Sequence, residues 1–185
     1  KKFEENFKTY SEVRHSIGVS NGTDALLIAM EALSKKGEVL VQPTTYVASA
    51  SMIPRIGNEV KFVDVDKKTW TIDPSSFENA ITNKTKAVMP VHLYGHPAKM
   101  DEILFIAEKY NIKVLEDAAP AIGATFNDKY CGTFGDISAF SFQGAKMMVT
   151  GEGGILMTNN DEYFESIKQY SEHGRSKDPN NTFWI

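Results

Sequence analysis

The chain of 185 residues is 42% hydrophobic and carries 20 Lys and Arg against 24 Asp and Glu, for a net charge of −4. This composition suits one globular domain and gives no electrostatic reason to expect nucleic acid as a partner. The charged and aromatic opening KKFEENFKTY does not resemble a secretion signal, and no apolar run approaches the ~20 residues of a membrane-spanning helix. We therefore expect a cytoplasmic protein without nucleic acid or membrane partners, whose single cysteine, Cys131, is a buried hydrophobic residue.

Hydrophobic periodicity predicts that helices and strands alternate along the chain. In chain order they are a helix over 24–35, a strand over 38–42, a helix within 46–56 and a strand over 61–66. They continue with a helix from Pro74 through Ile81, a strand over 86–93, a helix over 99–110, and strands over 113–117, 136–142 and 154–158. Pro54 is expected to kink or end the helix within 46–56, because proline cannot donate the backbone hydrogen bond of a helix interior.

This alternation predicts an α/β fold, in which a mostly parallel sheet is covered by helices on both faces. In such sheets ligands bind beyond the carboxyl ends of the strands. No linker or repeat divides the chain, so we expect one domain over residues 1–185. Its last residues, RSKDPNNTFWI, are a polar loop and an abrupt apolar triplet, which indicates an incomplete chain.

The stretch Ser20-Asn21-Gly22-Thr23-Asp24 lies directly before the first predicted helix. Gly22 and Thr23 would offer unpaired backbone N–H groups, a hydroxyl and the positive end of the helix dipole, which together suit a phosphate. The same residues also fit an ordinary helix N-cap, and both interpretations stay open for this stretch alone.

The strand over 113–117 ends in two carboxylates, Glu116 and Asp117. Alternate strand residues face opposite sides, so only one of the two can point into a given crevice, and the other can be structural. The functional hypothesis is an anion that holds a protonated ring nitrogen or a cation of the substrate. The alternative is a carboxylate that caps the next helix.

Lys146 lies between the strand over 136–142 and a glycine cluster at 151, 153 and 154. Apolar neighbours disfavour the charged form of an amine and make it available as a nucleophile toward carbonyl groups. Met147, Met148 and Val149 would supply such neighbours. The alternative is a surface lysine on a loop before a glycine-rich turn.

Together these features have one economical interpretation, a site for pyridoxal 5'-phosphate. Tyr46 would stack on the ring of the cofactor, Asp117 would keep its pyridine nitrogen protonated, and Lys146 would carry the Schiff base. The phosphate would be held by Gly22, Thr23 and Ser141. A nicotinamide site is set aside, because no G-x-G-x-x-G follows an early strand.

Five blocks, in order and with matching spacing, resemble the DegT/DnrJ/EryC1/StrS family of PLP-dependent nucleotide-sugar aminotransferases. They are SNGTDAL at 20–26, PTTYVASA at 43–50, VHLYGHPAKMD at 91–101, EDAAPAIGA at 116–124 and FSFQGAKMMVTGEGG at 140–154. The resemblance implies a large domain of the aspartate-aminotransferase type (fold type I). It also implies that the small C-terminal domain of the family is absent from this chain.

The resemblance supports the same site: Lys146 and Asp117 as catalytic residues, with Gly22, Thr23, Tyr46 and Ser141 around the cofactor. It implies transfer of an amino group from glutamate to a nucleotide-linked keto sugar, in lipopolysaccharide or related sugar synthesis, by a homodimer with shared active sites. Two alternatives stay open: a PLP-dependent sugar dehydratase, although that branch has histidine in place of the lysine, and a non-catalytic regulatory or binding protein.

Two positions depart from the family pattern. Pro120 stands where many relatives have Gln or Glu, and Ile122 stands where many have His, which leaves the substrate subgroup in doubt. His92 and His96 have a spacing that could share a metal on a helix, but Gly95 and Pro97 argue against a helix there, so no metal site is expected.

Overall fold

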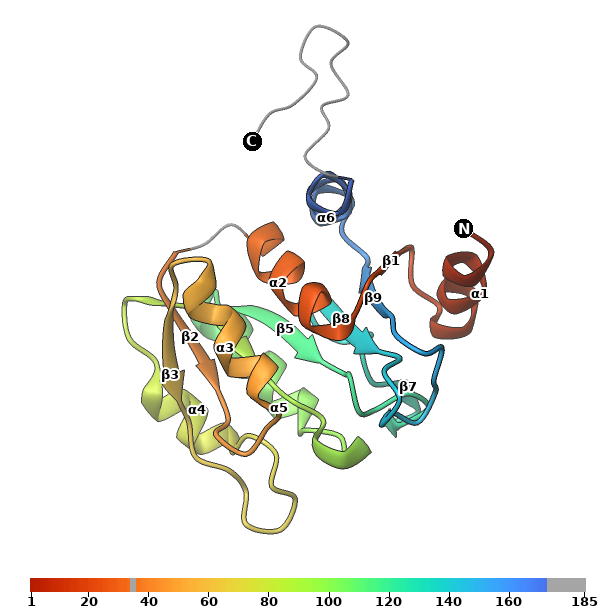
Figure 1. Cartoon of the computed structure of the whole chain (residues 1–185). Helices are drawn as coiled ribbons and strands as arrows, with labels where there is room; N and C mark the ends of the chain where they lie inside the picture. Colours follow the sequence, from red (N-terminus) through yellow and green to blue (C-terminus); the bar gives the residue numbers. More distant parts are fainter. Residues whose placement is uncertain (34–35, 173–185) are drawn as a thin grey trace, which may run out of the picture.

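A seven-stranded sheet forms the centre of the structure, a computed structural model that describes residues 1–33 and 36–172 (Figure 1). The strand order across the sheet is β1-β9-β8-β5-β4-β2-β3. In chain order the strands are β1 (His15–Val19), β2 (Glu38–Val41), β3 (Glu59–Phe62), β4 (Thr85–Met89), β5 (Lys113–Asp117), β8 (Ile137–Ser141) and β9 (Gly154–Thr158). A short hairpin of β6 (Thr125–Phe126) and β7 (Lys129–Tyr130) lies apart from this sheet.

The sheet is mostly parallel, as predicted. Each neighbouring pair from β3 through β2, β4 and β5 to β8 is parallel. Only β9 runs against its neighbours, because it pairs antiparallel with both β8 and β1. The carboxyl ends of five adjacent strands therefore meet at one edge, where open α/β sheets place their ligand sites.

Helices cover both faces of the sheet (Figure 1). They are α1 (Lys2–Ser11), α2 (Gly22–Leu33), α3 (Val47–Arg55), α4 (Pro74–Ala80), α5 (Met100–Tyr110) and α6 (Asp161–Ser171), with a 3-10 turn η1 (Leu93–Gly95). Helices α2 and α3 pack on one face, whereas α4 and α5 pack on the other. Pro54 lies in the last turn of α3, so this helix ends early at Arg55, as expected.

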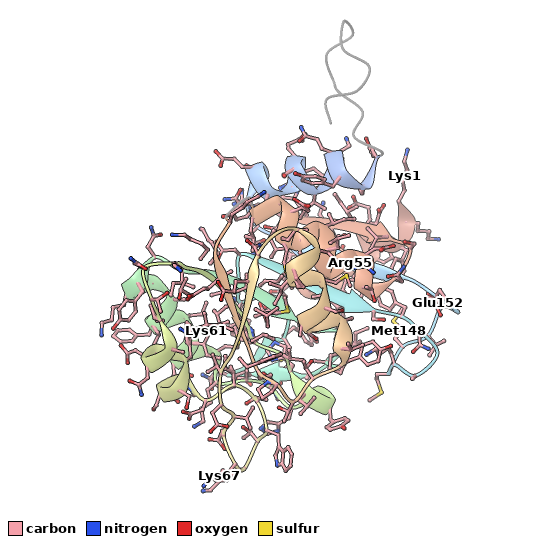
Figure 2. All side chains as sticks on the ribbon, turned by 60° about the vertical axis from the view of Figure 1, so that its left-hand side comes forward. Lys1, Arg55, Lys61, Lys67, Met148 and Glu152 are labelled. Carbon is pink, nitrogen blue, oxygen red and sulfur yellow. The ribbon has the colours of Figure 1, made fainter. Side chains whose placement is uncertain are left out.

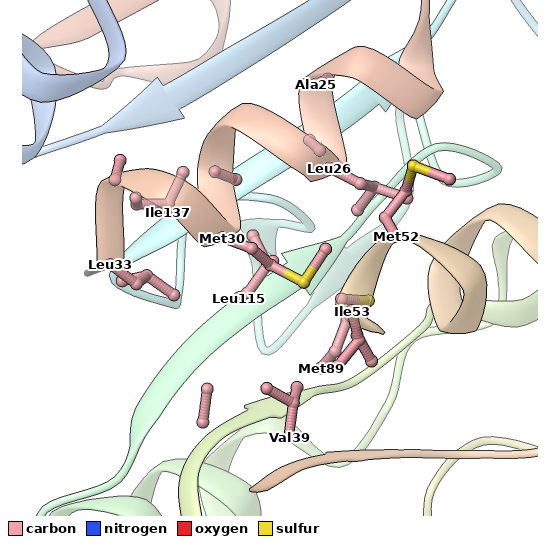
Figure 3. Packing of buried hydrophobic residues seen from close by; sticks show 14 of the residues in the cluster. Ala25, Leu26, Met30, Leu33, Val39, Met52, Ile53, Met89, Leu115 and Ile137 are labelled. Atoms are coloured by element: carbon pink, nitrogen blue, oxygen red, sulfur yellow. The ribbon is translucent and has the colours of Figure 1, made fainter. Parts of the chain in front are cut away.

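Strand alternation divides the core between the two faces. Val39 and Leu115 point toward α2 and α3, where they meet Met30 and Ile53 (Figure 3). The intervening strand residues point the other way, as Leu40, Val88 and Val114 pack with α4 and α5. A third cluster lies under α1, and its aromatic members are Phe7, Phe140 and Phe142.

Two predicted strands extend four residues past the observed ends of β3 and β4. Strand β3 ends at Phe62 because the chain then turns: the Asp66 carboxylate accepts the backbone N–H groups of Lys68 and Thr69. Strand β4 ends at Met89 because Pro90 has no N–H to donate. The prediction also missed β1, the β6–β7 hairpin, α1 and α6.

Some expectations concern positions outside the described residues. The predicted end of the first helix at 34–35 and the apolar triplet at 183–185 both lie there. Within residues 1–33 and 36–172, no helix is both long enough and apolar enough to cross a membrane.

Candidate functional site

The predicted site residues gather at the carboxyl edge of the sheet. Asp117 is the last residue of β5, and Ser141 is the last residue of β8. Gly22 and Thr23 open α2, and Tyr46 immediately precedes α3. Lys146 lies on the loop between β8 and β9.

Gly22 is packed tightly against Ser141. A Cβ atom at position 22 would lie 2.6 Å from the Ser141 Cβ atom and 2.9 Å from its Oγ atom. Gly154, the first residue of β9, is similarly close to the backbone carbonyl of Asn21. Glycine at these positions allows the start of α2 to approach the end of β8, which brings the Ser141 hydroxyl beside the helix N-terminus.

The start of α2 has an ordinary N-cap, and this cap is compatible with the phosphate interpretation. Asn21 is an N-cap: its Oδ1 atom accepts the Asp24 N–H at 2.8 Å, and its backbone carbonyl accepts the Ala25 N–H. The Asn21 amide also donates to the Asp24 carboxylate at 2.8 Å. This cap uses the N–H groups of positions 24 and 25, so those of Gly22 and Thr23 are the ones left to face an anion.

Asp117 is buried, with 3% of its surface exposed. Its Oδ2 atom accepts a 2.6 Å hydrogen bond from the Ser49 hydroxyl, and its Oδ1 atom accepts the Ala119 N–H at 3.2 Å. Burial raises the pKa of Asp117, whereas these two donors and the nearby charge of Lys146 act to lower it. The bond to Ala119 shows that the carboxylate also caps the turn after β5, so the capping alternative holds in part.

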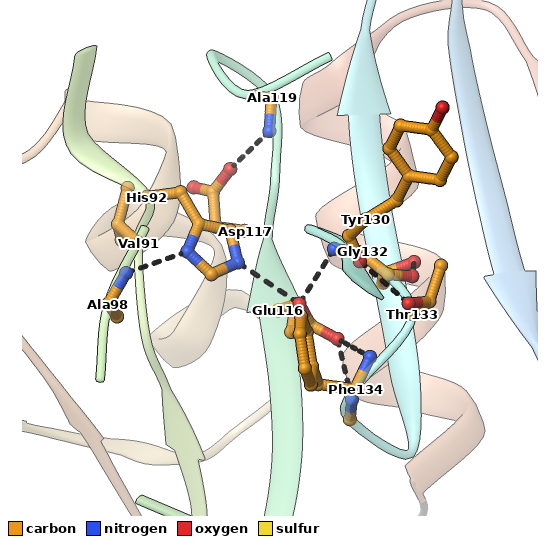
Figure 4. A network of polar contacts seen from close by, with 12 residues as sticks. Val91, His92, Ala98, Glu116, Asp117, Ala119, Tyr130, Gly132, Thr133 and Phe134 are labelled. Atoms are coloured by element: carbon orange, nitrogen blue, oxygen red, sulfur yellow. Dashed lines mark hydrogen bonds and ion pairs between the residues drawn. The ribbon is translucent and has the colours of Figure 1, made fainter. Parts of the chain in front are cut away.

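Glu116 faces the opposite side of the sheet, as strand alternation predicts. Its two oxygens accept the backbone N–H groups of Gly132, Phe134 and Gly135 at 2.7, 2.6 and 2.5 Å (Figure 4). Its Oε2 atom also lies 3.0 Å from the His92 Nε2 atom. Glu116 is therefore the structural carboxylate, because its acceptor capacity is used within the fold.

His92 is fixed between two partners. Its Nδ1 atom accepts the Ala98 N–H at 3.0 Å, so its Nε2 atom carries the proton and donates to Glu116 (Figure 4). The backbone beside it contacts the end of β5, since the His92 N–H bonds to the Asp117 carbonyl at 3.2 Å. Within the described residues, no group of three or more His, Cys, Asp or Glu side chains is placed to hold a metal ion.

Lys146 lies over Tyr46, with its Nζ atom 5.9 Å from the centroid of the tyrosine ring. The tyrosine is 71% exposed, so one face of its ring is accessible. The loop that carries Lys146 is closed by its own backbone bonds, from the Thr150 N–H to Phe142 and from the Phe142 N–H to Gly153. The amine of Lys146 therefore lies over the Tyr46 ring, and its charge acts on the Asp117 carboxylate.

The expectation of apolar surroundings for Lys146 is wrong for its sequence neighbours. Met147 is 81% exposed and Val149 is 51% exposed, and Figure 2 shows Met148 and Glu152 on the outside of this loop. The reason is that the loop leaves the sheet after Phe142 and makes its hydrogen bonds within itself, so its apolar side chains do not pack against the core.

The two departures from the family pattern lie beside these elements. The carbonyl of Pro120 contacts Gly95, where an added Cβ atom would lie 3.3 Å away. Ile122 packs against the aromatic cluster under α1. Ile122 is therefore a packing residue in this chain.

Sequence reasoning missed two polar residues of the site, Ser49 and Gln42. Gln42 is fully buried, and its side chain accepts the N–H groups of Ile72 and Val91 and donates to the carbonyls of Thr44 and Trp70. It fixes three loops at the carboxyl edge. A signal for Ser49 existed, because it occupies an inward position beside Ala48, Met52 and Ile53 on α3, where an apolar residue is expected.

The fold and the site edge together define an α/β domain of the fold type I class, which is found in PLP-dependent aminotransferases. Residues 1–185 match the model of the DegT/DnrJ/EryC1/StrS aminotransferase family. The chain belongs to this family.

Two curated relatives are named GDP-perosamine synthase. The protein from Escherichia coli O157:H7 is 46% identical over 175 residues, which cover 94% of this chain and 48% of the relative. The protein from Caulobacter vibrioides is 43% identical over 185 residues, which cover 99% of this chain and 49% of the relative. The chain thus spans about half the length of these relatives.

Solved structures show the same similarity. The aminotransferase from Psychrobacter cryohalolentis superposes with a TM-score of 0.93 at 41% identity, over 95% of this chain and 45% of that one. A Bacillus subtilis protein with the cofactor PMP bound gives a TM-score of 0.90 at 36% identity, over 100% of this chain and 42% of that one. The Escherichia coli GDP-4-keto-6-deoxy-D-mannose-3-dehydratase with bound hydrated PLP gives a TM-score of 0.90 at 32% identity. The match covers 96% of this chain and 48% of that one.

Proposed function

We propose that this chain is the cofactor-binding domain of a PLP-dependent aminotransferase that acts on nucleotide-linked keto sugars. The observation that carries the proposal is the meeting of two separate features at one edge of the sheet. Gly22 lies against Ser141 at the start of α2, and Lys146 lies near both Asp117 and Tyr46. The first feature suits a phosphate, and the second suits a cationic ring with a reactive carbonyl.

The residues present fit pyridoxal 5'-phosphate. The N–H groups of Gly22 and Thr23 and the hydroxyl of Ser141 would hold its phosphate at the positive end of α2. A side chain at position 22 would fill this space, which explains the need for glycine. Lys146 would hold the cofactor covalently through a Schiff base, and the exposed face of Tyr46 would stack on its ring.

When bound, the cofactor supplies an electron-poor ring that takes up the electron pair left at the substrate carbon. The task of Asp117 would be to accept a hydrogen bond from the protonated ring nitrogen and so keep it protonated, for which Asp117 must be a carboxylate. The Ser49 hydroxyl and the Ala119 N–H both favour that anion. The task of the Lys146 amine is to take a proton from the substrate carbon and return it, as general base and then general acid.

We propose glutamate as the amino donor and a nucleotide-linked keto sugar as the acceptor. The support is the family to which the chain belongs and the names of its relatives, which include GDP-perosamine synthase. The experiment is to incubate the full-length protein with glutamate and a panel of GDP-, dTDP- and UDP-linked keto sugars. Mass spectrometry should find a sugar in which an amine replaces the carbonyl oxygen, and no aminated product from any of them would contradict the proposal.

Dehydration of a keto sugar is a second candidate, because a GDP-4-keto-6-deoxy-D-mannose-3-dehydratase is among the similar structures. The lysine at position 146 favours transamination, since its amine can both bond to the cofactor and move a proton. The same mass spectra separate the two, because a dehydratase product has lost water and carries no new nitrogen.

We further propose that two copies of the protein associate around this edge. Exposed apolar side chains occur on both site loops, with Tyr46 and Val47 on one and Met147 on the other. A surface of this kind is typical of an interface. Sedimentation of the full-length protein should give twice the mass of one chain, and a purely monomeric species would contradict this.

A further inference from the structure

The Ser49 hydroxyl is the donor closest to the Asp117 carboxylate in the structure. Ser49 is 1% exposed, and its Oγ atom lies 2.6 Å from the Asp117 Oδ2 atom. A second hydroxyl lies behind it, because the Thr45 Oγ1 atom is 2.8 Å from the Ser49 Oγ atom. Thr45 directly precedes Tyr46 in the loop that leads into α3.

The direction of these hydrogen bonds follows from counting protons. A serine hydroxyl has one proton, and Ser49 donates that proton to Asp117. The bond between Thr45 and Ser49 must then be donated by Thr45. The result is a one-way chain of donors that runs from Thr45 through Ser49 and ends on the carboxylate.

The local sequence explains how this chain is held. Ser49 lies on the inward stripe of α3 with Ala48, Met52 and Ile53, and its N–H bonds to the Tyr46 carbonyl at 3.1 Å. Because Ser49 is 1% exposed, its hydroxyl has no access to solvent in this position. A buried hydroxyl in an apolar stripe is costly unless it is paired, and here its partner is the one carboxylate that points into the site.

We propose that Ser49 is a positioning residue, which keeps Asp117 ionised and fixes its carboxylate for the ring nitrogen of the cofactor, and that Thr45 supports it. This inference rests on the proposed function. It adds a residue that connects the loop of Tyr46 with the carboxylate that would pair with the ring nitrogen. A hydrogen-bond donor stabilises a carboxylate relative to its neutral acid.

The other groups that face Asp117 do not replace this donor. The Ala119 N–H bonds to the other oxygen, Oδ1, at 3.2 Å. Lys146 acts on Asp117 through its charge, and within the described part of the chain no hydrogen bond joins the side chain of Lys146 or of His92 to the Asp117 carboxylate. Glu116 points to the opposite face of the sheet. The Asp117 Oδ2 atom thus receives its hydrogen bond from Ser49.

The test uses the full-length protein and four variants: Ser49→Ala, Ser49→Thr, Thr45→Val and, as a control, Ser51→Ala on the same helix. Spectroscopic titration gives the Kd of pyridoxal 5'-phosphate. The pH profile of kcat gives the acid limb, the pH range in which activity falls as Asp117 becomes protonated. Ser49→Ala should raise Kd by about tenfold, as expected for a lost hydrogen bond to a charged group, and move the acid limb to higher pH. Ser49→Thr should retain both properties, Thr45→Val should cause a smaller change, and Ser51→Ala should cause none.

A double-mutant cycle separates this role from a merely structural one. In an Asp117→Asn background the carboxylate is gone, so Ser49→Ala should no longer change Kd. Two results would overturn the inference, provided that the unaltered protein binds the cofactor. One is an equal rise in Kd when Ser49→Ala is made in the Asp117→Asn background. The other is an unchanged Kd and pH profile in the Ser49→Ala single variant. Failure of the unaltered protein to bind the cofactor at all would instead overturn the proposed function, and this inference with it.

Discussion

Asp117 shows how a single residue can be costly for folding and, in the proposed function, useful for chemistry. Its side chain is almost completely buried, and burial raises its pKa. Ser49 and Ala119 offset part of this effect, and a cation above the carboxylate would offset more. Without such a cation, the ionised form is held at a cost to stability.

This cost predicts the effect of Asp117→Asn on the cofactor-free protein. The folded pKa is raised, so the cost is fully present above that raised value. It disappears as the pH falls below the ordinary value of about 3.9, where both folded and unfolded chains are protonated. The amide of the variant has no charge to bury, so we expect a higher free energy of unfolding in urea at neutral pH and a smaller difference toward low pH. A variant less stable than the original at neutral pH would contradict the burial argument.

A second residue-scale prediction concerns Cys131, which is 2% exposed. Burial, with the negative charge of Glu116 nearby, raises the pKa of the Cys131 thiol to about 12. Because the thiolate is the reactive form, iodoacetamide should not label Cys131 in the folded protein at neutral pH. Labelling should follow denaturation in urea, and rapid labelling of the folded protein would disprove this assignment.

At the scale of single residues, the sequence predicted most of the candidate site. The blocks of the family place Lys146, Asp117 and Tyr46 on three separate segments, and the structure brings these segments together. Ser49 was not predicted, because its role depends on a contact with a residue 68 positions away. A serine on the apolar stripe of α3 can be recognised in the sequence, but its partner cannot, because a contact over this distance leaves no pattern.

Among the elements, α2 has no room for a side chain at its first residue, Gly22. Gly22→Ala would place a Cβ atom 2.6 Å from the Ser141 Cβ atom, so the helix start and the end of β8 would have to separate. We expect the Kd of pyridoxal 5'-phosphate to rise by about tenfold or more, because the N–H groups would leave their positions.

Gly144→Ala is the matched control for this substitution. An added Cβ atom at Gly144 meets nothing within 4 Å, although this glycine lies on the loop that carries Lys146. Its Kd, measured by the same spectroscopic titration, should equal that of the unaltered protein. If Gly22→Ala and the unaltered protein bind pyridoxal 5'-phosphate with equal Kd, the start of α2 does not hold its phosphate.

Element prediction succeeded where the apolar pattern was long and regular. Strands β5 and β9 have their predicted bounds, and α5 begins one residue later than predicted. The helix α1 was missed because its apolar face is mainly aromatic: Phe3 and Phe7 pack on Phe142, at ring distances of 5.1 and 5.7 Å. This helix therefore supports the loop that holds Lys146, which could not be read from the sequence.

For the whole molecule, alternation of helices and strands was enough to predict a mostly parallel sheet and the edge that carries the site. The pairing of β1 with β9 was not predictable in this way, because it joins the start of the chain to a strand that follows all the others. Substrate choice belongs to the same scale. The chain spans about half the length of its relatives, so the proposed substrate must be tested with the full-length protein.

The central claim is that the amine of Lys146 bonds reversibly to pyridoxal 5'-phosphate. The most direct measurement is to reduce the full-length protein with borohydride, digest it and sequence the modified peptide by mass spectrometry. The account predicts a pyridoxyl group on Lys146 and on no other lysine of the chain. Bound cofactor with an unmodified Lys146 peptide, or a label on a different lysine, would contradict it.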